Sequence, residues 1–116
     1  MPTPETHLFL TYIRDAADLI EEFVGARAFS EYERNAMLRS AVERQFINIG
    51  ESVNLLSRAA PGAVSRIADY PDIISFRNTL VHEFFEVNHS TVWDIVKNHL
   101  PILRAELVEL MQEYER

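Results

Sequence analysis

Arg77, Asn78 and His82 interrupt a largely apolar stretch, residues 75–85, and their side chains suit one kind of chemistry. An imidazole titrates near neutrality, so it can take the proton from a ribose 2′-hydroxyl or give one to a leaving oxygen. A guanidinium can hold a phosphate and stabilise the charge that builds on it, and an amide can orient either group. These residue types together indicate cleavage of an RNA phosphodiester.

The spacing of the three residues decides how they can meet. Each residue turns a helix by about 100°, so Asn78 and His82 share a face, whereas Arg77 lies about 140° around the axis from His82. If one face packs against a second copy of the chain, the guanidinium can reach the imidazole or its own counterpart, which would build a composite cleft. The alternative is structural: His82 hydrogen-bonds within a buried interface while Arg77 pairs with Glu83 or Asp72.

Size and composition favour a single all-α domain spanning residues 1–116. The length of 116 residues is ordinary for one domain, and 47% hydrophobic with 25% charged residues is ordinary for a globular protein. The chain has only three glycines and five prolines, with little period-two alternation. This pattern favours long helices over the many turns of an all-β domain.

Neither a metal nor a cofactor is expected. The chain contains no cysteine, which excludes disulfides and thiolate ligands. His82 and Glu83 lack the second histidine that completes a zinc-binding helix. No segment has the long apolar run of a membrane helix or of a signal peptide, so we expect a cytoplasmic protein with no membrane contact.

The net charge of −7 and the pI near 5.0 oppose non-specific attraction to nucleic acid. Any RNA must therefore meet a local basic patch. Arg34, Arg39, Arg44 and Arg58 could form a rim for RNA phosphates, although solvated salt bridges explain them more simply. The acidic surface also suits a basic protein partner, and solubility alone explains it equally well.

Two long helices are expected in the first half of the chain. The first runs from about Pro4 to Val24, with Thr3 as N-cap and Gly25 as the terminating glycine. The second follows the capping-box pattern of residues 30–33 and continues to Pro61, which begins a connection with a short helical segment.

Two more helices are expected in the second half. One starts at Tyr70-Pro71 and carries the polar motif, and the last follows the cap candidates Asn88 to Ser90 and should be kinked by Pro101. Trp93 in the last helix is expected in the core rather than as a stacking platform for bases. Four amphipathic helices with short connections predict an antiparallel four- to five-helix bundle, and the surplus apolar surface predicts a homodimer.

Gly50 lies in the middle of the second predicted helix, where glycine costs about 1 kcal/mol relative to alanine. Such a glycine usually marks the close approach of another helix. Glu51 beside it has two interpretations: it pairs with Arg77 or another basic group near the cleft, or it is an exposed helical glutamate.

The motif Arg77-Asn78-(x3)-His82 resembles that of the HEPN superfamily, and its surroundings are similar to the HepT-like toxin branch. The resemblance covers about residues 8–111. Three blocks carry it in order: Ile47–Ser52, Phe76–Phe85, and Val92–Val96 with Leu100-Pro101.

The resemblance implies an all-α bundle that dimerises with its two motifs facing one cleft. It implies a metal-independent endoribonuclease toxin of a type VII-like toxin–antitoxin pair that cleaves RNA, tRNA being one candidate. Arg77 would clamp the phosphate, Asn78 would orient the reacting groups, and His82 would act as general acid or base. The implied partner is a minimal nucleotidyltransferase antitoxin, which adds AMP to a tyrosine two residues after the histidine.

Phe84 stands where that tyrosine is expected, and a phenyl ring cannot accept AMP. Three outcomes stay open: neutralisation by complex formation alone, modification of another hydroxyl, or a chain that no longer acts as a toxin. Glu51 and Phe84 are expected beside the cleft as secondary site residues, next to the catalytic candidates Arg77, Asn78 and His82. The alternative function is a non-catalytic helical module that binds a minimal nucleotidyltransferase.

Overall fold

The computed structural model describes the backbone of residues 4–114 and, within that range, every side chain except that of Phe84. All regular structure in this range is helical, which confirms the all-α prediction. In chain order the elements are α1 (Pro4–Val24), α2 (Phe29–Arg34), α3 (Ala36–Ala59), α4 (Pro61–Val64), α5 (Tyr70–His82), the 3₁₀ turn η1 (Phe84–Glu86), α6 (His89–Asp94), the π-helical turn η2 (Ile95–His99) and α7 (Leu100–Tyr114).

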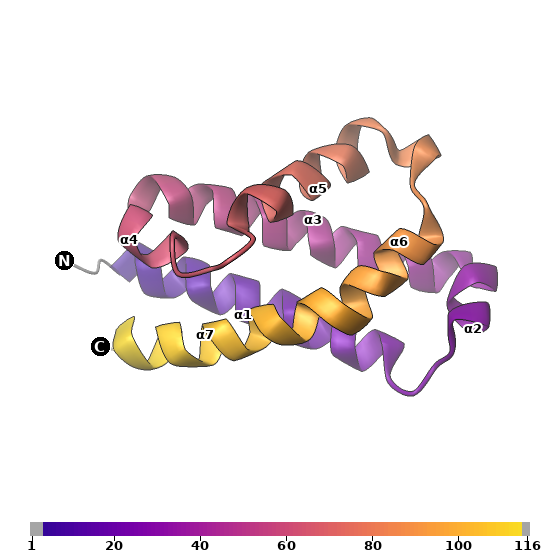
Figure 1. The fold of residues 1–116 in the computed structure, drawn as a ribbon, viewed down its shortest axis with the longest axis horizontal. Coiled ribbons are helices and arrows are strands. Elements are labelled where there is room, and N and C mark those ends of the chain that lie inside the picture. Colours follow the sequence, from indigo (N-terminus) through magenta and orange to yellow (C-terminus); the bar gives the residue numbers. More distant parts are fainter. Residues whose placement is uncertain (1–3, 115–116) are drawn as a thin grey trace.

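The long helices alternate in direction along the bundle, and α1 begins at the same end of the molecule at which α7 ends (Figure 1). α1 packs along α3, α7 lies on α1, and α5 lies on the other side of α3. α3 is therefore the helix that connects the main bundle to the motif-bearing α5. Among residues 4–114, no helix combines the length and the apolar character needed to cross a bilayer.

α1 has the predicted bounds, because its apolar residues recur at helical spacing and one stripe of them is buried against α3 and α7. Gly25 follows with a φ of +50°, a left-handed conformation that favours glycine at a helix end. The predicted cap Thr3 lies outside the described residues. The core that this helix shares with its neighbours includes Leu10, Ile13, Ile20, Val42, Ile49, Val53, Leu56, Leu100 and Leu107.

The prediction of one uninterrupted second helix starting at the capping box of residues 30–33 is wrong. The chain forms α2, breaks at Asn35, and restarts as α3. Asn35 has an extended backbone, and its side-chain oxygen accepts a hydrogen bond from the Leu38 N–H at 3.0 Å, so it is the N-cap of α3. The residue at the N-cap of α2 is Ala28, whose N–H donates to Glu31 at 3.3 Å, and Ser30 lies inside the first turn.

The C-terminal helical segment is irregular just before Pro101, as predicted from the missing proline N–H. The irregularity is the π-helical turn η2, in which the Leu100 N–H donates to the Ile95 carbonyl. Trp93 packs against the core as expected, with its ring centroid 5.3 Å from that of Tyr32 and 6.1 Å from that of Phe29. These contacts hold α6 against α2, at the end of the bundle where the chain turns after His82.

Candidate active site

The crossing of α5 over α3 is centred on Gly50. A Cβ atom built on Gly50 would lie 2.2 Å from Cβ of Arg77, 2.8 Å from its Cγ and 3.2 Å from the carbonyl oxygen of Ile73. Any other residue at position 50 would push the two helices apart, because two of these distances are too short for real atoms. The expectation that the mid-helix glycine marks a close helix approach is confirmed, and the helix that approaches is the one carrying the motif.

The guanidinium of Arg77 is held in place by two oxygens. Its Nη2 lies 2.8 Å from Oε2 of Glu51, and its Nη1 donates to Oδ1 of Asn78 at 2.8 Å. The Arg77 side chain is only 30% exposed, and its buried Nε finds no hydrogen-bond partner among the described side chains and backbone. Arg77 therefore does not pair with Glu83 or Asp72, as the structural alternative expected. Glu51 fits both of its interpretations, because it is 48% exposed and ion-paired.

His82 is the last residue of α5 and its side chain is exposed. The helix ends directly after it, where the Glu83 N–H donates to the Thr79 carbonyl at 2.8 Å. Within the described part of the chain, no hydrogen bond or ion pair joins His82 to Arg77 or Asn78. One subunit thus holds the guanidinium and the amide together and leaves the imidazole apart, in solvent. The idea that His82 hydrogen-bonds within a buried interface does not fit the single chain.

Phe84 begins η1, two residues after His82, so its backbone lies in the turn that follows the motif helix. Its side chain lies outside the described residues.

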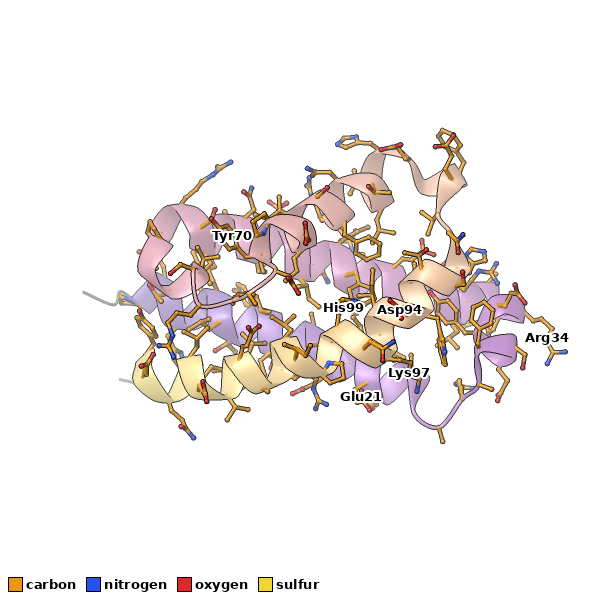
Figure 2. The ribbon with its side chains drawn as sticks, viewed as in Figure 1. Glu21, Arg34, Tyr70, Asp94, Lys97 and His99 are labelled. Atoms are coloured by element: carbon orange, nitrogen blue, oxygen red, sulfur yellow. The ribbon has the colours of Figure 1, made fainter. Side chains whose placement is uncertain are left out.

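An apolar cavity of about 270 Å³ lies between α3, α5 and the C-terminal helices η2 and α7. Its floor is apolar and its rim carries the carboxylates of Asp69, Asp72 and Glu106. None of the predicted site residues lines it. Asp94 and His99 lie close together on the C-terminal segment, with 3.6 Å between carboxylate and imidazole (Figure 2). Because none of the motif side chains lines this cavity, it is not part of the candidate active site.

A cluster of polar residues that the sequence did not reveal lies where α2 and α6 meet α3. Burial raises the pKa of the Tyr32 phenol, and the nearby Glu43 carboxylate raises it further, whereas Arg39 opposes the shift. Burial also raises the pKa of the Glu43 carboxyl above its ordinary value of 4.5, although His89 and Arg39 oppose this. No spacing in the sequence signals the cluster, because α2, α3 and α6 come together only through tertiary packing.

Comparisons with known proteins show the family to which the chain belongs. Residues 13–110 match the family described as "Ribonuclease HepT-like". The chain is 26% identical to the candidate RNase TTE0752 of Caldanaerobacter subterraneus subsp. tengcongensis over 97% of this chain and 98% of that protein. It is 28% identical to the probable ribonuclease HepT of Thermococcus cleftensis over 88% of this chain and 92% of that protein.

A third relative is longer. The chain is 24% identical to a protein of Methanocaldococcus jannaschii named as a gamma-glutamylcyclotransferase and candidate RNase, MJ0434, and spans 50% of its length. No solved structure matches the chain. The match to the family covers most of the chain, including α3, α5 and the motif between Arg77 and His82. The chain belongs to the HepT-like ribonuclease family.

Proposed function

We propose that the chain is a metal-independent endoribonuclease toxin of a type VII-like toxin–antitoxin pair, and that a second copy of the chain completes its active site. The observation that carries this proposal is the preset guanidinium of Arg77. Glu51 and Asn78 hold it at 2.8 Å each, its buried Nε is a donor with no partner among the described residues, and His82 follows five residues later on the same helix.

The proposed reaction uses these groups for RNA cleavage, with tRNA as one candidate substrate. Arg77 holds the scissile phosphate. The imidazole of His82 takes the proton of the 2′-hydroxyl, the 2′-oxygen attacks phosphorus, and the bond to the 5′-oxygen breaks. An imidazolium, from the same or the second copy, returns a proton to the leaving 5′-oxygen. The products are a 2′,3′-cyclic phosphate and a 5′-hydroxyl, and no step requires a metal ion or a water molecule.

A second copy is needed because one chain leaves its imidazole apart from its guanidinium. The surface beside His82 is suited to contact another subunit. Val81 is 38% exposed and Phe85 is 73% exposed, and Ile74 lies half-buried on the same helix. Covering these apolar groups with a second chain would remove them from water and bring two motifs to one cleft. The two-fold axis would then pass near the C-terminal end of α5.

The proposed partner is a minimal nucleotidyltransferase antitoxin, which acts on this chain by complex formation alone. Phe84 offers no phenolic oxygen at the position that the family's partner modifies. Two of the four tyrosines are poorly placed to replace it: Tyr32 is fully buried, and Tyr70 lies at the opposite end of α5 from His82 (Figure 2).

A second candidate function is a non-catalytic helical module that binds such a nucleotidyltransferase. Two observations favour it. Glu51 already occupies the guanidinium that the phosphate would need, and Phe84 removes a hydroxyl next to the motif.

RNA cleavage by the purified chain separates the two functions. Total RNA is incubated with the chain in EDTA, beside His82→Ala, Arg77→Ala and the control His99→Ala, which removes an exposed histidine of η2 that is not part of the motif. The enzyme proposal expects cleavage in EDTA that falls by about 10²- to 10⁴-fold in His82→Ala and survives in His99→Ala. Cleavage that is absent at every pH and with every RNA, or that persists in both motif variants, would favour the binding module.

A further inference from the structure

The arginines of the chain divide into two groups by their partners. Arg14 on α1, Arg66 in the turn after α4 and Arg104 on α7 are paired with carboxylates: Arg14 with Asp15, Arg66 with Glu113, and Arg104 with Asp18 and Glu21. On α3, by contrast, Arg44 and Arg58 are exposed, and no ion pair holds either of them among the described residues. A chain with a net charge of −7 has carboxylates to spare, yet Arg44 and Arg58 on α3, like the exposed Arg34 on α2, have no ion pair among the described residues.

Arg44 and Arg58 lie in line with the candidate active site. They stand seven residues before and seven residues after Glu51 on α3. Seven residues are close to two full turns and rise about 10.5 Å, so the three side chains lie along one line on the helix surface. Glu51 binds Arg77, which inserts the third guanidinium between the other two. Arg44, Arg77 and Arg58 thus form a stripe about 21 Å long, hereafter the arginine stripe.

The surface between these arginines mixes apolar and polar groups: Leu55, four residues after Glu51, is 36% exposed on this side of α3. Asn48 and Asn54 are half-buried near the stripe and offer amide groups that suit sugars and bases. Glu51 is the one carboxylate on this side of α3, and its charge is matched by Arg77. The other carboxylate of α3, Glu43, belongs to the cluster with Tyr32 and His89. An anionic strand on the stripe would therefore meet three guanidiniums and one carboxylate, and so an excess of positive charge.

We infer that the arginine stripe binds the phosphates of a single RNA strand and leads the scissile phosphate to Arg77. This inference rests on the proposed ribonuclease function and adds the residues that bind the substrate. A single line of cations follows one backbone, whereas a duplex presents two backbones and a denser charge to a protein that is acidic elsewhere. Arg34, which projects outward at the end of the molecule where α3 begins (Figure 2), can extend the track beyond Arg44.

Salt dependence of binding tests the stripe directly. A labelled single-stranded RNA is titrated with His82→Ala chain, which prevents cleavage, between low and moderate salt. Removing one arginine that binds a phosphate should reduce the slope of log affinity against log salt by about 0.7. We expect Arg44→Ala/Arg58→Ala in this background to lower the slope by about 1.4 and to weaken binding about tenfold. The matched control is Arg14→Ala/Arg104→Ala, which removes the same charge from α1 and α7 and should leave the slope unchanged.

Two results would overturn the inference: an unchanged slope in the stripe variant, or an equal reduction in the control, which would indicate only a net-charge effect. Kinetics with the cleaving chain separate this failure from failure of the proposed function. The stripe variant should raise KM more than it lowers kcat. Cleavage that depends on His82 but is unaffected by the loss of Arg44 and Arg58 would refute RNA binding by the stripe and still support the ribonuclease. Salt-dependent binding through the stripe without any cleavage would refute the ribonuclease and still support RNA binding by the stripe.

Discussion

Gly50 and Arg77 are in direct contact, and the absence of a side chain at position 50 determines where the guanidinium lies. α5 approaches α3 so closely that the stem of Arg77 fills the space that a Cβ atom would need. The position of the proposed phosphate clamp is therefore a consequence of helix packing.

Gly50→Ala should destabilise the fold and displace Arg77. The added methyl would lie 2.2 Å from Cβ of Arg77, which is fixed to the backbone and cannot swing away. Overpacking of this kind costs about 1 to 3 kcal/mol, partly offset by the better helix propensity of alanine. Thermal unfolding should show a melting temperature lowered by several degrees. Gly62→Ala is the matched control, because no atom lies within 4 Å of its built Cβ. Equal melting temperatures for the two variants would contradict the packing argument.

Glu51→Gln should tighten RNA binding. The carboxylate competes with a phosphate for the same guanidinium, and removing its charge frees Arg77 while keeping a similar shape. An exposed ion pair is worth about 0.2 to 1 kcal/mol, so we expect KM for RNA to fall by up to about fivefold. A rise in KM together with a fall in kcat would indicate instead that Glu51 holds Arg77 in its working position.

Glu43→Gln should stabilise the protein at neutral pH and leave its stability unchanged in acid. Because burial raises the pKa of Glu43 in the folded state, the carboxyl favours folding below 4.5, its ordinary value, and loses this contribution as pH rises through the folded-state pKa. Glutamine stays neutral throughout. Near pH 4 the variant and the parent should have the same melting temperature. Towards pH 8 the melting temperature of the variant should exceed that of the parent by a few degrees.

Trp93, the single tryptophan, reports the same region, since its ring lies 5.3 Å from that of Tyr32. Its fluorescence should change less with pH in Glu43→Gln than in the parent. The control is Glu22→Gln on the exposed surface of α1, which should show no pH-dependent gain. A loss of stability at neutral pH would mean that the ionised carboxylate of Glu43 is well paired with His89 or Arg39.

Phe84→Tyr should make the chain a substrate for nucleotide transfer. The substitution places a phenolic oxygen two residues after His82, at the position that the proposed nucleotidyltransferase partner would modify with AMP. Incubation with a minimal nucleotidyltransferase and ATP should increase the mass of the variant by one AMP and leave the parent unmodified. Modification of the parent on another hydroxyl would refute neutralisation by complex formation alone.

Much of the fold follows from local patterns, and the failures have physical causes. The bounds of α1, the terminating Gly25 and the close approach at Gly50 were all predictable from periodicity and glycine placement. The break at Asn35 was missed because the apolar stripe continues across it, although Asn35 before an apolar run is itself a capping signal. The local pattern allowed both outcomes, and the packing of α2 against α6 decided between them.

The pairings among the candidate site residues could not be predicted from the sequence. Glu51 and Arg77 lie 26 residues apart in the sequence, on different helices, so Glu83, Asp72 and Glu51 were equal candidates until α5 was placed on α3. The exposure of His82 likewise depends on where α5 ends. In the proposed function, guanidinium and imidazole meet only when two copies of the chain associate, a step that no single chain contains.

The most direct test of this association is complementation between two inactive chains. Arg77→Ala and His82→Ala are each purified, shown to be folded, and then mixed and allowed to exchange subunits before RNA is added. A shared cleft predicts that mixed dimers contain one intact guanidinium and one intact imidazole, so the mixture should recover a substantial fraction of parent activity. A mixture that forms dimers and remains as inactive as its two components would contradict a site built from two subunits.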